Sequence, residues 1–299
     1  MRFDSANLDA RAMTEYYAAS EAAEDSCPVR RMFGANGLRA PNVLWDPEMH
    51  ELHNPILVRF ATIVRGVSDE AGRIPLDRFR LDTFSRVLNR MIVLDVTSEG
   101  VFRYSHYGSE IARHHGRDIT GESTDGFAPH ISAFFNALYG AVCQRRRPVL
   151  SEHEPPKDVF VSQWRRLIVP VVHPSGEVVR LASLTLAEDP LTQGLELMLD
   201  PVFIVDDRLQ VRWGNRPARL LTGLRNGRGV SVDFTGLTGV ILDPDVAPCE
   251  LLGRRIVPPR TQVANLDGGV QACAPVVSGI LHRDESFYLV TLRPDDAPI

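Results

Sequence analysis

Between Met91 and Ala187 the hydrophobic spacing changes from strand-type to helix-type and back, and this order restricts the fold more than any other feature. A helical stripe runs over Ile131–Arg147. Around it lie five apolar, β-branched runs typical of strands, at 91–96, 100–108, 149–153, 162–173 and 178–187. Five hairpin-linked strands with one long helix inserted predict an α+β domain, a five-stranded antiparallel sheet with helices on one face.

A second block begins at Leu191 and has the same opening: an apolar helix end, a strand hairpin, a short helix and a glycine. Its expected elements are strands at 202–205 and 209–213, a helix at 215–222 and a closing hairpin at 270–282 and 287–292. The middle, 224–265, is rich in Gly and Pro and has no long amphipathic pattern. The repeated opening indicates a duplication at the scale of a domain. We therefore expect domains at 48–190 and 191–299, after an N-terminal helix and linker at 1–47.

The N-terminal residues predict a weakly amphipathic helix and then an irregular linker. Large apolar side chains are too few on the helix, 5–25, for it to stand alone, so it should pack against something. The linker, 26–47, carries three prolines and two glycines. A second helix should begin at Asn54-Pro55, because Asn caps helices well and Pro is favoured at their first position. It should end at Gly66.

Composition excludes several classes of function. The chain has 299 residues and a formal net charge of -5, which does not favour binding to nucleic acid. Its longest apolar runs are far too short to span a bilayer, and the N-terminus lacks a signal-peptide pattern. Four cysteines without metal-type spacing predict free thiols in a cytoplasmic protein without direct membrane insertion. We find none of the common nucleotide-binding or hydrolase motifs.

Both blocks carry residues that resemble PAS domains. In the second block, Val202–Asp206 is followed by Val211–Ala218, a hairpin that ends in Trp-Gly-Asn and leads to a short helix and Gly223. The first block is similar to a bacterial variant of the family over about 56–188. Its matching segments are Arg65-Gly66, Ile74-Pro75, Phe102–Ser109, Gly116–Gly121 and Leu167–Pro170. The second match implies a degenerate PAS domain, because its Gly/Pro-rich middle departs from the pattern.

The resemblance implies a bacterial signal-transduction protein, a sensor or adaptor that binds a ligand or a partner. The chain ends seven residues after the last expected strand, so we expect no output domain and action by contact on a regulator such as a histidine kinase. We also expect a homodimer whose interface includes the N-terminal helix, because PAS relatives commonly pair through a helix that precedes the sheet.

A ligand pocket is expected between the sheet and the helix 131–147. Phe102, Tyr104 and His106 should share one face of their strand. The candidate ligand-binding residues, which combine apolar bulk with polar tips, are Tyr104, His106, Phe134, Phe135 and Tyr139. The alternative is that they simply fill the core.

Two other classes of function stay open at this point. One is a small-molecule enzyme with a cone-shaped pocket that uses His106 or His130 as a base; the other is a purely structural interaction protein. Either histidine could also ligate haem, since one imidazole in an apolar pocket suffices. The residues carry no flavin signature and no cluster of metal ligands, so we expect no cofactor, a colourless protein and no catalytic residue.

Overall fold

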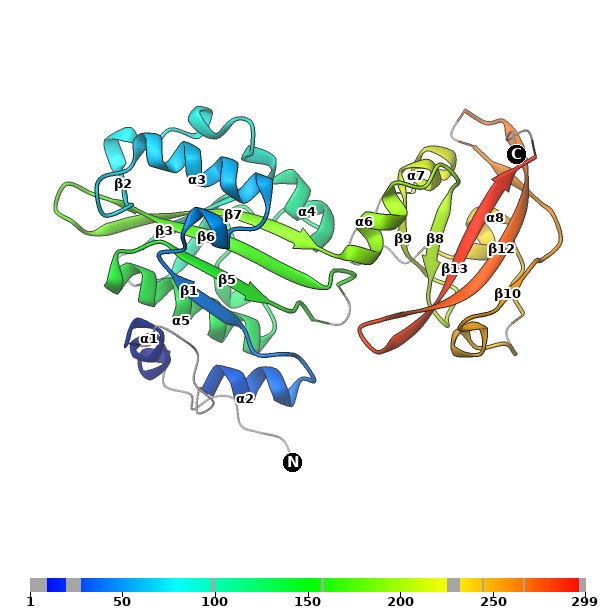
Figure 1. Ribbon diagram of the computed structural model, residues 1–299, viewed down its shortest axis with the longest axis horizontal. Coiled ribbons are helices and arrows are strands. Elements are labelled where there is room, and N and C mark those ends of the chain that lie inside the picture. The colour runs from blue at the N-terminus through cyan, green and yellow to red at the C-terminus, as the bar shows by residue number, and fades with distance from the viewer. Residues whose placement is uncertain are drawn as a thin grey trace. The chain divides into compact units, whose positions relative to one another are not determined.

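The computed structural model describes residues 10–19, 28–97, 100–156, 159–224, 232–243, 245–265 and 267–295. They form two compact units, drawn in Figure 1. Unit 1 comprises Met1–Ala112, Asp118–Pro156 and Gln163–Glu188, and unit 2 comprises Arg113–Arg117, Lys157–Ser162 and Asp189–Ile299.

Unit 1 is built on one sheet with the strand order β1-β5-β6-β7-β3-β4. The strands are β1 (Asn42–Trp45), β2 (Ile74–Pro75), β3 (Met91–Val96), β4 (Phe102–Tyr107), β5 (Val149–His153), β6 (Gln163–Val172) and β7 (Val178–Glu188). All neighbouring strands are antiparallel except β2, which pairs parallel to β6. The five predicted strands β3 to β7 are present, and β1 and β2 are additional.

Helices cover both faces of this sheet. The helices are α1 (Ala10–Ala19), α2 (Pro28–Ala35), α3 (Pro55–Val67), α4 (Ser109–His115) and α5 (Pro129–Arg145). On β6, Leu167 and Val169 belong to the core under α3, whereas Arg166 points to the ring of Phe135 on α5. Successive side chains of a strand point to opposite faces, so α3 and α5 lie on opposite sides of the sheet, as Figure 1 shows.

The predicted α+β class with antiparallel sheets is therefore confirmed, but helices lie on both faces of the unit 1 sheet. The reason is that both faces of β6 are apolar: Ile168, on the α5 side, is as deeply buried as Val171 on the α3 side. Such a sheet needs a helix on each side to exclude water. The capping prediction for α3 holds as well, since the Asn54 side chain accepts a hydrogen bond from the Ile56 N–H.

Part of the predicted linker, 26–47, is regular structure. It contains α2, whose Val29 and Phe33 are buried, and β1, which pairs with β5. Sequence spacing could not reveal either, because an eight-residue helix and a four-residue strand depend on distant partners for stability. Of the predicted helix 5–25, the structure describes α1; residues 5–9 and 20–25 lie outside the described residues.

The α1 helix packs on α5 of its own chain. Met13 and Tyr17 are both 3 % exposed, and the Tyr17 ring lies 6.0 Å from that of Phe134. The contact is close, because a Cβ at Gly140 would come within 2.8 Å of the Thr14 side chain. The face of α1 that was expected to reach a second chain is therefore already covered within this one.

Unit 2 has a sheet of order β10-β12-β13-β8-β9, with β11 also paired to β12. The strands are β8 (Val202–Val205), β9 (Val211–Gly214), β10 (Arg255–Ile256), β11 (Thr261–Ala264), β12 (Val270–His282) and β13 (Glu285–Pro294). Its helices are α6 (Pro190–Glu196), α7 (Arg216–Thr222) and α8 (Phe234–Thr238). Leu195 of α6 packs on one face of this sheet, whereas residues of α7 and α8 join the core on the other.

The two units repeat one topology. In unit 1 the order β4-β3-β7-β6-β5 places the first hairpin beside the closing hairpin, and in unit 2 the order β9-β8-β13-β12 does the same. Among the five strands β3 to β7 of unit 1, the middle one in the sequence is β5. It corresponds to the two short strands β10 and β11 of unit 2, which pair with different parts of β12. The helix before the first hairpin, α3 or α6, covers one face in each unit. The internal repeat predicted from the opening of each block thus extends through both sheets.

Short 3-10 turns complete the described parts of both units. They lie at Met49–Glu51, Leu76–Arg78, Leu81–Phe84, Leu88–Arg90, Thr124–Gly126 and Pro248–Leu251.

Candidate functional site

Four of the five predicted pocket residues meet between α5 and the sheet of unit 1. Tyr104 projects from β4, and Phe134, Phe135 and Tyr139 project from α5; none is more than 2 % exposed. The rings of Phe135 and Tyr139 stack with their centroids 5.6 Å apart, as residues four apart on a helix can. This aromatic layer is the candidate site. Whether it binds a ligand stays a prediction.

His106 lies on the opposite face of the sheet from the aromatic layer. A β-bulge shifts the register of β3 and β4, so that Leu94 pairs with Tyr104 but the preceding Val93 pairs with His106. Because the extra residue, Ser105, reverses the alternation, Tyr104 and Tyr107 both point inward and His106 points to the α3 side. The expectation that Phe102, Tyr104 and His106 share one face was therefore wrong.

On the α3 side, His106 lines a surface cleft of 390 Å³. Its Nε2 lies 3.0 Å from the carbonyl oxygen of Leu88. The other residues of the cleft are Phe79, Arg80, Leu81, Val93, Ser105 and Arg180. Arg180 forms an ion pair with Asp95 at 2.7 Å. His130 is buried at the start of α5, so the two histidines considered as bases do not share a site.

A buried arginine, not identified from the sequence, completes the aromatic layer. Arg166 on β6 is only 7 % exposed, and its guanidinium lies 4.4 Å from the ring centroid of Phe135 and 5.9 Å from that of Trp164. Its Nη1 donates to the imidazole Nδ1 of His153 at 3.2 Å. The available signal was the Arg165-Arg166 pair within an apolar strand, since alternation must turn one of two adjacent arginines inward.

The groups around Arg166 are held in their neutral forms. Burial, together with the charge of Arg166, puts the pKa of His153 well below its usual value, so the imidazole accepts a hydrogen bond without carrying a charge. Burial also raises the pKa of Tyr104 and of Tyr139, although the charge of Arg166 opposes both shifts.

Several buried polar atoms on this side of the sheet have no hydrogen-bond partner within the described part of the chain. They include the Nε of Arg166, the Oγ of Ser151, the Nε2 of His130 and, further along the sheet on β1, the Nε1 of Trp45. Ser151 stands directly opposite Arg166 in the β5–β6 pairing, so both side chains are on the α5 side. Buried polar atoms are nearly always paired in folded proteins, and a group of unpaired ones marks a position for a water molecule or a ligand.

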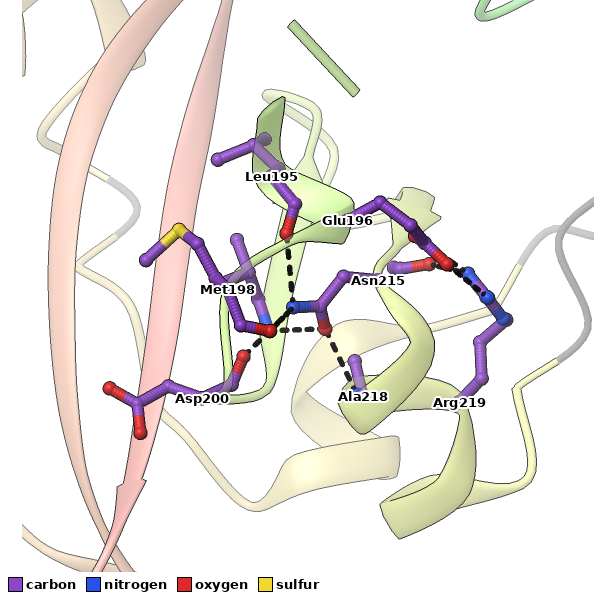
Figure 2. A network of polar contacts seen from close by, with 9 residues as sticks. Leu195, Glu196, Met198, Asp200, Asn215, Ala218 and Arg219 are labelled. Atoms are coloured by element: carbon purple, nitrogen blue, oxygen red, sulfur yellow. Dashed lines mark hydrogen bonds and ion pairs between the residues drawn. The ribbon is translucent and has the colours of Figure 1, made fainter. Parts of the chain in front are cut away.

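In unit 2, one asparagine joins two helices to the sheet, as Figure 2 shows. Asn215 is fully buried, and its Oδ1 accepts from the backbone N–H groups of Val202 and Ala218 at 2.9 and 3.0 Å. Its Nδ2 contacts the carbonyl oxygens of Leu195, Met198 and Asp200. A Glu196–Arg219 ion pair joins the same two helices, α6 and α7. The Asn215 side chain therefore fixes the C-terminal end of α6 against the N-terminal end of α7.

A serine, a histidine and an aspartate also meet in unit 2, but not as a catalytic triad. The Oγ of Ser162 and the Oδ2 of Asp189 lie 3.3 and 3.0 Å from the same ring nitrogen, Nε2 of His282. A triad needs its acid and its nucleophile on opposite nitrogens. The Asp189 carboxylate also caps α6 by accepting from the Leu191 N–H, and the Phe160 ring stacks on His282. The hydrogen bonds and the ring stacking of this cluster therefore serve to hold the start of α6 in place, not to catalyse a reaction.

No group of three or more His, Cys, Asp or Glu side chains among the described residues is placed to hold a metal ion. No helix in the same parts of the chain is long and apolar enough to cross a membrane.

Comparisons with known proteins give structural neighbours only. No family model and no curated protein matches the chain. The PAS domain of nitrogen regulation protein NR(II) from Vibrio parahaemolyticus is 24 % identical and covers 36 % of this chain and 99 % of its own, with a TM-score of 0.29. A PAS domain of an HTR-like protein from Haloarcula marismortui is 13 % identical, covers 35 % and 93 %, and has the same TM-score.

A longer neighbour is the periplasmic sensory domain of the Campylobacter jejuni chemoreceptor Tlp1. It is 10 % identical and covers 95 % of this chain and 93 % of its own, with a TM-score of 0.23. The chain is similar to PAS sensory domains, the family that its sequence resembles.

Proposed function

We propose that the chain is a sensor or adaptor in signal transduction and that unit 1 binds a small molecule in the aromatic layer. The observation that carries this proposal is the group of buried, unpartnered polar atoms of Arg166, Ser151 and His130 in a layer otherwise made of aromatic rings. Ligand sites in proteins combine apolar walls with a few well-placed polar groups in this way. A core that only stabilised the fold would gain by replacing these atoms with apolar ones.

Unit 2 would pass the change on to a partner protein. The chain leads directly from the last strand of unit 1, β7, into α6, whose C-terminal end is fixed by Asn215 and the Glu196–Arg219 pair. A change at the end of β7 would therefore act on a helix that is firmly attached to the unit 2 sheet. We propose a cytoplasmic regulator such as a histidine kinase as the partner, with no catalysis by this chain.

The direct test is to identify small molecules released from the protein. The full chain is purified under native conditions and denatured, and the supernatant is examined by mass spectrometry. We expect one compound in near-stoichiometric amount from the wild type and its loss when Phe135→Ala opens the layer. Asn215→Ala, which alters unit 2 only, is the control and should release the compound unchanged. Release of no compound, together with no stabilisation by a metabolite library, would reject a ligand-binding function.

We also propose that the protein is a homodimer, the commonest assembly of soluble proteins. Because α1 is covered by α5, the dimer should form without it. Light scattering on the full chain and on a chain beginning at Pro41 should then give a dimer in both cases. A monomer in both cases at micromolar concentration would reject the dimer. If only the full chain forms a dimer, the interface includes the N-terminal helix, as expected from the sequence.

A further inference from the structure

The most unusual group in the molecule is the guanidinium of Arg166, a permanent charge inside an aromatic layer. Arginine stays protonated at every physiological pH, so it cannot escape burial by losing its proton. Removing such a charge from water is unfavourable by several kcal/mol unless a partner compensates. A buried arginine is therefore expected to have an anion beside it.

None of its described neighbours carries a negative charge. His153 accepts one hydrogen bond as a neutral imidazole. The ring of Phe135 offers its face to the guanidinium, a contact that stabilises a cation but leaves the net charge in place. No ion pair to Arg166 occurs among the residues that the structure describes, and its Nε donates to none of them.

The adjacent arginine, Arg165, has its positive charge balanced by carboxylates of the chain. Arg165 projects from the other face of β6, where its Nε lies 2.5 Å from the Glu152 carboxylate and its Nη1 lies 3.6 Å from that of Glu188. Two carboxylates thus serve the more exposed arginine, while the more buried one has none. Within the described residues the guanidinium of Arg166 is therefore left without an anion, which a bound ligand would supply.

We infer that the ligand proposed for unit 1 is a small monocarboxylic acid with an apolar body, and that Arg166 selects it. This inference rests on the proposed function. The planar fork of an arginine matches a carboxylate and binds it through two parallel hydrogen bonds. The unpartnered hydroxyl of Ser151, opposite Arg166 on the neighbouring strand, supplies a further donor. The rings of Phe134, Phe135 and Tyr139 suit the apolar body.

The test compares an acid and its neutral amide, benzoate and benzamide, which have nearly the same shape. Binding to the full chain is measured by calorimetry, with hexanoate and hexanamide as a second pair. The wild type should bind the acid roughly 10- to 100-fold more tightly than the amide, the range expected for a charge-assisted hydrogen bond. In Arg166→Met the preference should vanish. Arg165→Met, which changes the arginine on the opposite face, should keep it.

A second variant and a second measurement cover the case in which Arg166→Met fails to fold. Arg166→Lys keeps the charge but loses the fork and should lower affinity for the acid without abolishing the preference. The molecule released from the wild type should also ionise as a carboxylic acid. Equal binding of acid and amide, or release of a neutral compound, would overturn the inference but leave the ligand-binding function intact. Neither release nor binding of any probe would overturn both.

Discussion

At the scale of single residues, Phe134 is the side chain most central to the α5 side of unit 1. It is fully buried, and its ring lies within 6.0 Å of the rings of Tyr17, Phe33 and Phe135. Phe134→Ala should therefore destabilise unit 1 by about 3–5 kcal/mol, measured by denaturant unfolding, since it leaves a cavity among rigid rings. Arg103→Ala, at an exposed position of β4, is the control. A loss below about 0.5 kcal/mol, a typical surface value, would contradict the burial of this side chain.

His153 should make the protein less stable in acid. Burial and the charge of Arg166 put its pKa below the ordinary value of 6.5, so the unfolded chain binds a proton that the folded one refuses. The free energy of unfolding is then at its full value above pH 6.5. As the pH drops below 6.5, it decreases by up to about 1.4 kcal/mol for each pH unit. Unfolding at pH 7.5 and 5.5 should show the loss in the wild type. His153→Gln should reduce it, and the remainder should come from His130, whose pKa burial also lowers. An equal loss in both proteins would contradict the assignment.

The sequence predicted which aromatic residues form the layer but not which polar group lies within it. Helical spacing alone places Phe134, Phe135 and Tyr139 against the sheet. The position of His106 depended on one extra residue in β4, and a bulge leaves no mark on hydrophobic spacing. Arg166 was missed for a related reason, because the burial of a charge depends on which helix covers that face of the strand.

At the scale of elements, the attachment of α1 depends on the absence of a side chain at Gly140. A Cβ there would meet the Thr14 side chain at 2.8 Å, whereas a Cβ at Gly66 on α3 would meet nothing within 4 Å. Gly140→Leu should displace α1 and expose Ala10–Ala19 to trypsin, while α5 stays folded because Leu is a good helix former. Gly66→Leu should leave the digestion pattern of α1 unchanged. Protection of α1 in both variants would show that it does not dock on α5.

Elements with strong local signals were predicted closely, and elements held by distant partners were not. β3 and β5 have the bounds expected from the sequence, and α3 and α5 differ by one or two residues. By contrast, α2 and β1 fell within the predicted linker. A four-residue strand such as β1 exists only because Asn42–Trp45 finds an open edge at β5, and no local pattern records that edge.

At the scale of the whole molecule, each unit has a core of its own. The core under α3 lies within unit 1, and the two clusters around β8, β12 and β13 lie within unit 2. Heating should therefore give two transitions in calorimetry. Phe134→Ala should shift one and Asn215→Ala the other, the latter because at least two buried N–H groups lose their acceptor, at a cost of about 2 kcal/mol or more. A single transition that both variants shift equally would contradict independent cores.

The β1–β5 pairing has a consequence for the nascent chain. Ribosomes make proteins from the N-terminus, so β1 exists long before the chain reaches Val149, which pairs with Trp45. Until then the backbone N–H and C=O groups of β1 have no partner strand. The unfinished unit 1 therefore exposes unpaired strand edges, to which another chain can bind. Closing so long a loop is also slow. Chaperones that hold nascent chains would therefore meet this protein during synthesis of the first sheet, before any strand of unit 2 has been made.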